Sequence, residues 1–332
     1  MIRFTSPWKS CALLLLAAGL NLQAQELSFL GGLMDEGNHG QSSYTWQVDY
    51  RQDLYEYLAA SAAYLNEGHV PGHHRDGTAF ELWGRLPFDQ DRFALSLGVG
   101  AYYFYDTQLL PSGDSANMHG TAPIISLSGT GYLSDRWFYR IMLNRINPAN
   151  DIKVNTVAVG VGYWFGKGGK PTRGNLGDAP DEHGYVTENQ LTVFGGQSVV
   201  NTFLSQQARA YAIEYRRGLI PHLDWTVSGI YEGDPQITRR SGIATQIWPV
   251  NTFFDDRVAV GLGIGPYIYV DKKHPVSPDK KIPAAVAPLL SLAVSARLTD
   301  DWFVRAVWDR VTTGYNRDSD IFLIGLGYSW AR

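Results

Sequence analysis

The sequence predicts an all-β protein, a transmembrane antiparallel β-barrel of about sixteen strands built from two eight-strand repeats. Three observations predict it: an apolar pattern of period two, connections that alternate in length, and an internal repeat with a constant shift of 165 residues. One sixteen-strand barrel and two eight-strand barrels in series both fit. We favour the single barrel because its lumen can hold water, whereas inward glycines and alanines would leave an eight-strand interior underfilled.

Residues 1–24 are predicted to be a secretory signal peptide, because Arg3 and Lys9 precede a short apolar run that ends in small and polar residues near Ala24. The run is too short to cross a bilayer. Removing Arg3 and Lys9 leaves 26 of the 28 basic residues against 32 acidic ones. The exported chain has no basic cluster suited to nucleic acid, so we expect no nucleic-acid partner.

The strands follow from the alternation of apolar and small or polar residues. Val157, Val159 and Val161, for example, alternate with Thr156 and Ala158, so that one face suits lipid and the other suits an interior. Sixteen such segments start near Leu27, Tyr44, Tyr57, Ala79, Phe93, Thr121, Phe138, Val154, Leu191, Arg209, Asp224, Gly242, Val258, Pro283, Phe303 and Ile321.

Connections between these segments alternate between tight and long. Residues 133–136 and 298–301 are tight turns, whereas 106–120 and 271–281 are long. Short periplasmic turns and longer outer loops are typical of outer-membrane barrels in Gram-negative bacteria, which is where we expect the protein. The last strand, which ends Tyr328-Ser329-Trp330, resembles the C-terminal signal recognised by the barrel-assembly machinery.

The repeat divides the chain. Ala122-Pro123, Leu133, Trp137-Phe138 and Arg140 recur without a gap as Ala287-Pro288, Leu298, Trp302-Phe303 and Arg305. We therefore predict a first eight-strand repeat at 25–165, a periplasmic linker at 166–189 rich in Gly, Pro and charge, and a second eight-strand repeat at 190–332.

Strand parity points a set of charged and amide side chains into the lumen of both halves. They are Asp49, Arg51, Arg140 and Asn144 in the first half, and Glu214, Arg216, Arg305 and Asp309 in the second. They could form a charged constriction that selects solutes, or a salt-bridge ladder that stiffens the wall. Parity turns Arg145 and Arg310 outward near the outer rim, where the phosphates of lipopolysaccharide could contact them.

Residues 66–77 read as an outer loop rich in histidine and carboxylate. Imidazole and carboxylate groups suit zinc or copper, so this loop is a candidate metal or ligand site, although its spacing matches no standard motif and an exposed polar loop explains it equally well. The candidate ligands are Glu67, His69, His73, His74 and Asp76.

The run Trp137-Phe138-x-Arg140, Asn147-Pro148-x-Asn150 and Gly160-x-Gly162-Tyr163-Trp164-Phe165 resembles the C-terminal strands of small eight-strand outer-membrane proteins. The lipid A 3-O-deacylase family is the nearest of these. That resemblance implies a His-x-Ser pair on a barrel strand that cleaves an acyl ester. No His-x-Ser occurs in this chain, so the chemistry does not transfer.

These observations favour a porin-like channel or export conduit for a hydrophilic solute or a polysaccharide. The alternatives are a lipid-modifying enzyme of the outer membrane and a barrel whose loops bind a surface partner. We assign no catalytic residue and expect no cofactor. Outer-membrane lipid and lipopolysaccharide are the expected surroundings.

Overall fold

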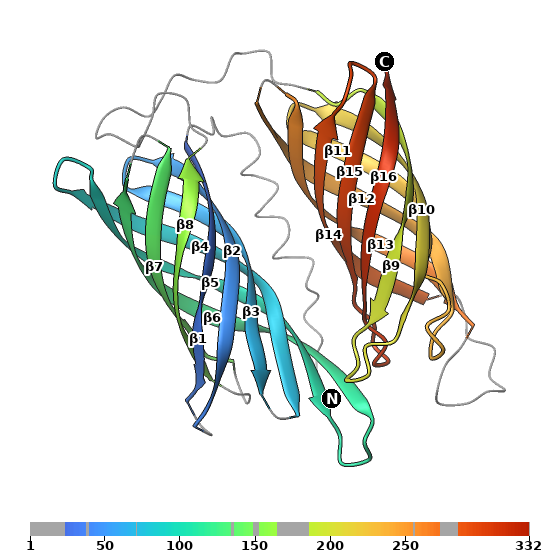
Figure 1. Ribbon diagram of the computed structural model, residues 1–332, viewed down its shortest axis with the longest axis horizontal. Coiled ribbons are helices and arrows are strands. Elements are labelled where there is room, and N and C mark those ends of the chain that lie inside the picture. The colour runs from blue at the N-terminus through green and yellow to red at the C-terminus, as the bar shows by residue number, and fades with distance from the viewer. Residues whose placement is uncertain are drawn as a thin grey trace, which may run out of the picture. The chain divides into compact units, whose positions relative to one another are not determined.

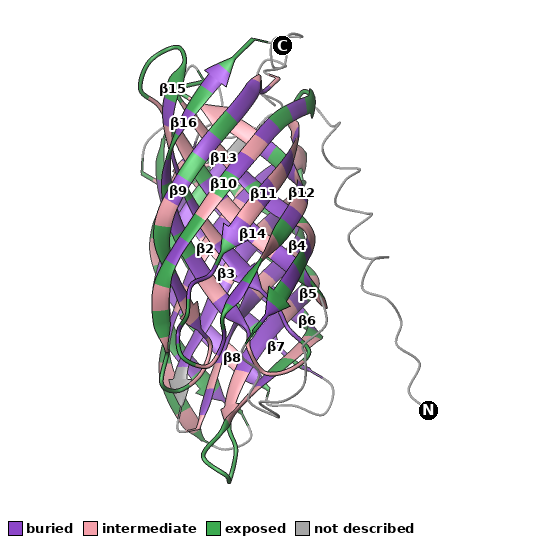
Figure 2. Ribbon diagram, turned by 90° about the vertical axis from the view of Figure 1, so that its right-hand side faces the viewer, coloured by how far each residue is buried: buried purple, intermediate pink, exposed green. Residues whose placement is uncertain are grey.

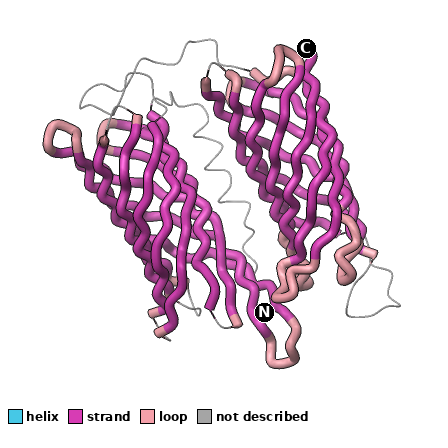
Figure 3. The backbone as a smooth tube through the Cα atoms, viewed as in Figure 1, coloured by secondary structure: helices cyan, strands magenta, loops and turns pink. Residues whose placement is uncertain are grey.

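The computed structural model describes residues 24–37, 40–70, 72–133, 136–148, 153–164, 186–254, 256–272 and 285–331. They form two closed antiparallel barrels of eight strands each (Figure 1). The predicted all-β class and all sixteen predicted strands are confirmed, and the described backbone consists of strands joined by turns and loops (Figure 3). In this part of the chain no helix is long and apolar enough to cross a membrane.

The first barrel contains β1 to β8. Their bounds are β1 Ala24–Glu36, β2 Gln41–Tyr55, β3 Leu58–Val70, β4 His73–Phe88, β5 Phe93–Leu109, β6 Ser115–Tyr132, β7 Trp137–Ile146 and β8 Val154–Trp164. The second barrel contains β9 to β16. Their bounds are β9 Asn189–Val200, β10 Gln207–Ile220, β11 Leu223–Tyr231, β12 Arg240–Phe253, β13 Val258–Asp271, β14 Ala285–Arg297, β15 Trp302–Val311 and β16 Ser319–Trp330.

Each half closes on itself. In the first barrel β8 pairs with β1, so that Val161 lies opposite Phe29, and in the second β16 pairs with β9, so that Ile324 lies opposite Gly195. The single sixteen-strand barrel that we favoured was therefore wrong, and the alternative of two eight-strand barrels is the one observed.

Large aromatic rings explain why a small interior can be filled despite its many glycines. A Cβ atom added to Gly98 would lie 2.8 Å from the ring of Trp83, and one added to Gly263 would lie 2.6 Å from that of Trp248. The ring of Phe138 covers Gly162 in the same way. The glycines make room for a ring from a neighbouring strand, so aromatic rings fill the space that these glycines leave in each interior.

In the second barrel the connections at one end have two to four residues and those at the other end have six to thirteen, whereas in the first barrel the two ends differ less, because connection 71–72 is short as well. One end, the turn end, carries the connections 56–57, 89–92 and 133–136 in the first barrel and 221–222, 254–257 and 298–301 in the second, together with the first and last strand termini. The other end, the loop end, carries 37–40, 71–72, 110–114 and 147–153, and then 201–206, 232–239, 272–284 and 312–318.

The outward face of each barrel is apolar. Along β16 buried and exposed residues alternate over most of the strand, with Phe322, Ile324 and Leu326 at least 50% exposed. Figure 2 shows the same alternation across the strands of both barrels. A continuous apolar exterior around a polar interior is the arrangement that a lipid-embedded barrel requires.

The predicted repeat has a structural counterpart. Strands of the two barrels begin at residues 58 and 223, 93 and 258, 137 and 302, and 154 and 319, a constant difference of 165. Apart from Ala24, the predicted signal peptide lies outside the described residues, as does all of the predicted linker except 186–189.

Candidate functional site

The eight predicted lumen residues all lie inside the barrels. Each of these residues is at most 4% exposed. They comprise Asp49, Arg51, Arg140 and Asn144 in the first barrel and Glu214, Arg216, Arg305 and Asp309 in the second. The period-two pattern of each strand sets this placement, because the residues two positions away on the same strand are buried or partly buried.

Asp49 lies between two arginines in the first barrel. Its Oδ2 is 3.5 Å from Nη2 of Arg51 and 3.6 Å from Nη1 of Arg140. Asn144, nearer the loop end, donates to Gln47 at 3.0 Å. The buried carboxylate of Asp49 thus contacts two buried guanidinium groups, as the salt-bridge ladder requires.

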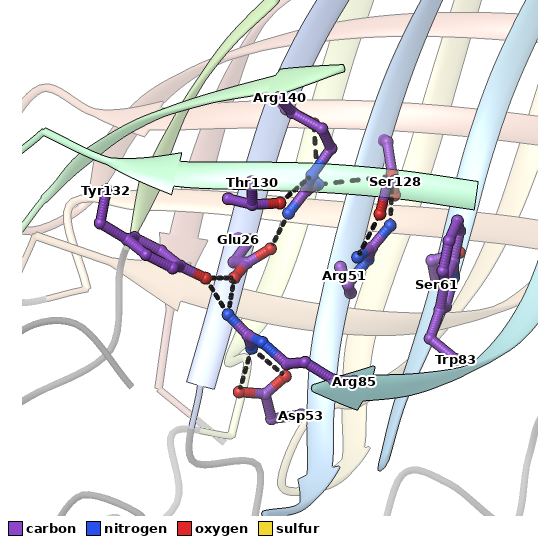
Figure 4. Close-up of polar contacts among 12 residues, drawn as sticks. Glu26, Arg51, Asp53, Ser61, Trp83, Arg85, Ser128, Thr130, Tyr132 and Arg140 are labelled. Atoms are coloured by element: carbon purple, nitrogen blue, oxygen red, sulfur yellow. Dashed lines mark hydrogen bonds and ion pairs between the residues drawn. The ribbon is translucent and has the colours of Figure 1, made fainter. Parts of the chain in front are cut away.

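A second cluster closes the turn end of the first barrel (Figure 4). Arg85 donates from Nη1 to both carboxylate oxygens of Asp53 at 3.0 Å and from Nη2 to Oε1 of Glu26 at 2.9 Å. Glu26 also pairs with Arg140 and accepts from the hydroxyl of Tyr132 at 2.9 Å. We call Glu26, Asp53, Arg85 and Tyr132 the turn-end plug. Sequence reasoning missed it, although the inward parity of Arg85 could have indicated it.

The second barrel holds a related but different network. Glu214 accepts from Nη1 of Arg305 at 2.7 Å and from Nε of Arg216 at 3.2 Å. Nη1 of Arg216 also lies 3.5 Å from Asp224, and Arg305 donates to Gln190 at 2.5 Å. Deeper in the barrel, Asp309 accepts a hydrogen bond from Ser291.

A buried tryptophan stacks on one arginine in each barrel. The guanidinium carbon of Arg51 lies 3.7 Å from the ring centroid of Trp83, and that of Arg216 lies 4.2 Å from the centroid of Trp248. Each indole donates to a hydroxyl group of the neighbouring strand, at 2.8 and 2.9 Å. The stack removes the guanidinium from water while the ring face partly compensates its charge.

Each barrel carries an arginine–glutamate pair at its loop end. Arg75 and Glu67 are joined by three contacts of 2.7 to 3.0 Å, and Arg240 and Glu232 by contacts of 2.6 and 2.8 Å. All four residues are at most 1% exposed. The two pairs are 165 residues apart, so the repeat extends to residues that we read as an outer loop. In the structure that region is β3, a two-residue connection and β4.

The predicted metal site is not formed by the described side chains. Its candidate ligands were Glu67, His69, His73, His74 and Asp76. The carboxylate of Glu67 is bound to Arg75, and Nδ1 of His73 lies 2.7 Å from Asp106. The side chain of His69 lies outside the described residues. Within those residues, no three or more His, Cys, Asp or Glu side chains come together in a way that could hold a metal ion.

Arg240 of the second barrel also contacts the loop-end connection 312–318. Nη1 and Nη2 of Arg240 donate to the carbonyl of Arg317 at 3.1 Å, and Nη2 donates to Ser319 at 2.7 Å. The hydroxyl of Tyr315 donates to Asp271 at 2.8 Å. Burial, partly offset by Arg240, raises the pKa of Tyr315, so this loop phenol keeps the proton that it donates.

The predicted outward arginines have different environments. Arg145 is exposed on β7. Arg310 is only 4% exposed, because its Nη1 is bound to Asp320 at 2.7 Å. The guanidinium of Arg310 is thus paired with Asp320 and little exposed, unlike that of Arg145, so the two side chains do not share the exposed position that parity predicted for both.

No protein-family model and no curated protein sequence matches this chain. Solved structures of outer-membrane barrels do. The N-terminal barrel domain of Pseudomonas aeruginosa OprF matches 43% of this chain and 98% of its own, with 13% identity and a TM-score of 0.37. Ail of Yersinia pestis matches 43% of this chain and 99% of its own, with 12% identity and a TM-score of 0.35. Neisserial surface protein A matches 42% of this chain and 96% of its own, with 6% identity and a TM-score of 0.36. Each match spans about one of the two barrels of this chain.

Proposed function

We propose that this chain is an outer-membrane binding protein with two closed barrels, and that the loop end of the second barrel binds the phosphates of lipopolysaccharide. The observation that carries the proposal is a basic rim in which the backbone of Arg239 is hydrogen-bonded to Lys272 and to Asp271. The turn ends would face the periplasm and the loop ends the outer surface, as the lengths of the connections favour.

The rim consists of Arg209 on β10, Arg239 just before β12 and Lys272 just after β13, all exposed. The backbone amide of Lys272 donates to the carbonyl of Arg239 at 3.0 Å, so these two residues are neighbours. The amide of Arg239 also donates to Asp271 at 3.3 Å. The counterparts at a distance of 165 are Tyr44, His74 and Thr107, so the rim belongs to the second barrel alone.

Lipopolysaccharide is the anion that an exposed ring of cations at the outer rim would meet first. An exposed ion pair contributes about 0.2–1 kcal/mol, so three such contacts correspond to roughly threefold to a hundredfold in affinity. Preorganisation strengthens such contacts, because the backbone amides of Arg239 and Lys272 are already hydrogen-bonded before the ligand binds.

Calorimetric titration of the refolded protein in detergent with lipopolysaccharide tests this. The triple variant Arg209→Ala, Arg239→Ala, Lys272→Ala should bind at least threefold more weakly, and the difference should shrink in high salt. Dephosphorylated lipopolysaccharide should not distinguish the two proteins.

A matched control removes three exposed cations from the turn ends: Arg92→Ala, Arg136→Ala, Arg217→Ala. Its affinity should equal that of the wild type. If both triple variants lose affinity equally, the effect is one of net charge, and the basic rim is not the binding site.

The predicted porin-like channel assumed the lumen of a sixteen-strand barrel, which the two closed barrels do not form. Their interiors hold packed rings and ion-paired arginines instead. Planar bilayers containing the refolded protein should therefore show no ohmic conductance steps. Steps whose size scales with salt concentration would contradict a closed pair of barrels.

The lipid-modifying alternative gains no support from the strands that suggested it. β7 and β15, over Trp137–Ile146 and Trp302–Val311, contain neither histidine nor serine. A serine-hydrolase arrangement needs both groups in contact.

A further inference from the structure

The turn end of the second barrel lacks the plug that closes the first. A distance of 165 places Val250 at the position of Arg85, Gly218 at that of Asp53 and Arg297 at that of Tyr132. The position of Glu26, which faces Arg51, is taken by Gln190, which faces Arg216. The second barrel has thus lost the arginine and both carboxylates of the plug.

A pocket occupies the vacated place. Its lining includes Gln190, Arg216, Val250, Arg297, Phe303 and Arg305. Residues of the connections 254–257 and 298–301 also line it, so it opens at the turn end.

One lining group in this pocket lacks a hydrogen-bond partner. Nη2 of Arg216 is buried and makes no hydrogen bond within the described residues, and Arg216 as a whole is 3% exposed. In the first barrel Nη1 of Arg51, the counterpart of Arg216, donates to Ser128 at 3.3 Å. Its Nη2 likewise makes no hydrogen bond, but it lies 3.5 Å from Oδ2 of Asp49, whereas no ion pair of this kind is found for Nη2 of Arg216 among the described residues. Ala293 stands in place of that serine and also lines the pocket. A buried N–H donor without an acceptor costs free energy, which an acceptor on a ligand would recover.

Cations lie at two depths of the pocket. Arg216 and Arg305 lie on the strands, and Arg257 and Arg297 lie at the mouth, where the amide of Arg297 donates to the carbonyl of Arg257 at 2.8 Å. Of the lining acids, Asp224 is already bound by Thr187 and Arg216. The other two, Asp256 and Asp300, are exposed to water at the mouth, so their charges are screened more than those inside.

We propose that this pocket binds a small organic anion, with a carboxylate or phosphate oxygen accepting a hydrogen bond from Nη2 of Arg216. A charge-assisted bond of this kind is stronger than a neutral one, and the mouth arginines would receive a second anionic group. Phe303 and Val250 provide an apolar wall for a short carbon chain.

The test introduces residues of the turn-end plug of the first barrel into the second. The double variant Gln190→Glu, Val250→Arg restores two groups of the plug while leaving every arginine of the pocket in place. The aspartate of the plug cannot be restored, because a Cβ at Gly218 would lie 2.7 Å from the backbone of Thr187. The variant Ala293→Leu fills the pocket without altering its charge.

Calorimetric titration with succinate and with inorganic phosphate separates the two ligand chemistries, and succinamide serves as the neutral control. The wild type should bind one of the anions at one site per chain, and both variants should bind it at least tenfold more weakly. Circular dichroism establishes that each variant is folded, and Ala293→Leu alone decides the question if the double variant does not fold. Undiminished binding in a folded variant, or no binding of either anion at millimolar concentration, would overturn the proposal.

Discussion

The loop-end pair of the second barrel offers the sharpest test of the energetics described above. Arg240→Leu removes a guanidinium that is fully buried and leaves the carboxylate of Glu232, which is 1% exposed, without its cation. Removing one partner of a buried ion pair costs about 3–5 kcal/mol, because the remaining charge stays buried. The same substitution releases the connection 312–318, which Arg240 ties to the barrel through the carbonyl of Arg317.

The assay is urea unfolding of the protein refolded into lipid vesicles, followed by fluorescence and by proteolysis of each barrel. Only the transition of the second barrel should move, because each barrel has its own closed set of strand pairings. Arg75→Leu should produce a similar shift in the transition of the first barrel.

A double-mutant cycle separates the pair from its surroundings. Because Arg240→Leu with Glu232→Leu leaves no uncompensated charge, the double variant should be more stable than Arg240→Leu alone. Additive losses, or a shift below about 1 kcal/mol for Arg240→Leu, would refute the view that this buried pair is strongly coupled.

Five further substitutions probe the interiors by the same assay. Trp83→Phe and Trp248→Phe should each destabilise their own barrel by about 1–3 kcal/mol, because a buried hydroxyl loses its donor and the arginine loses the larger ring. Gly100→Ala should lower the urea midpoint of the first barrel markedly, since its Cβ would lie 1.9 Å from a carbonyl oxygen, whereas Gly129→Ala, with nothing within 4 Å, should leave it unchanged. Arg85→Ala should cost the first barrel about 3–5 kcal/mol and leave the second unaffected, because two buried carboxylates lose a cation; equal shifts in both transitions would contradict separate barrels.

Much of this fold could be predicted from the sequence, because side chains along a barrel strand alternate between the inward and the outward face and the residue types alternate with them. Alternation places Arg51 and Arg140 inside without any knowledge of their partners. The same parity, applied through the 165-residue shift, places Arg216 and Arg305 inside the second half.

Closure could not be predicted in this way. Whether β8 pairs with β1 or β9 leaves every alternation unchanged, so the choice depends on whether the interior can be filled. That depended on Trp83 lying over Gly98 and Phe138 over Gly162, contacts between neighbouring strands that a single-strand pattern does not contain.

The loop-end pairs were missed for a different reason. The histidines, Gly68 and Gly72 made residues 66–77 look like an exposed loop. The recurrence of Glu67 and Arg75 as Glu232 and Arg240 was the signal for a buried pair within the repeat.

Because each barrel closes on its own, its strand pairings span a limited sequence separation. The strand pairing of largest sequence separation joins Glu26 to Trp164 in the first barrel and Asn189 to Trp330 in the second, so neither closing contact crosses from one half of the chain to the other. Contacts of shorter sequence separation carry a smaller loop-closure cost and form faster. A barrel that has closed no longer offers a free strand edge to its neighbour. A second self-closing unit therefore lengthens the chain without lengthening the sequence separation that its strand pairings must span.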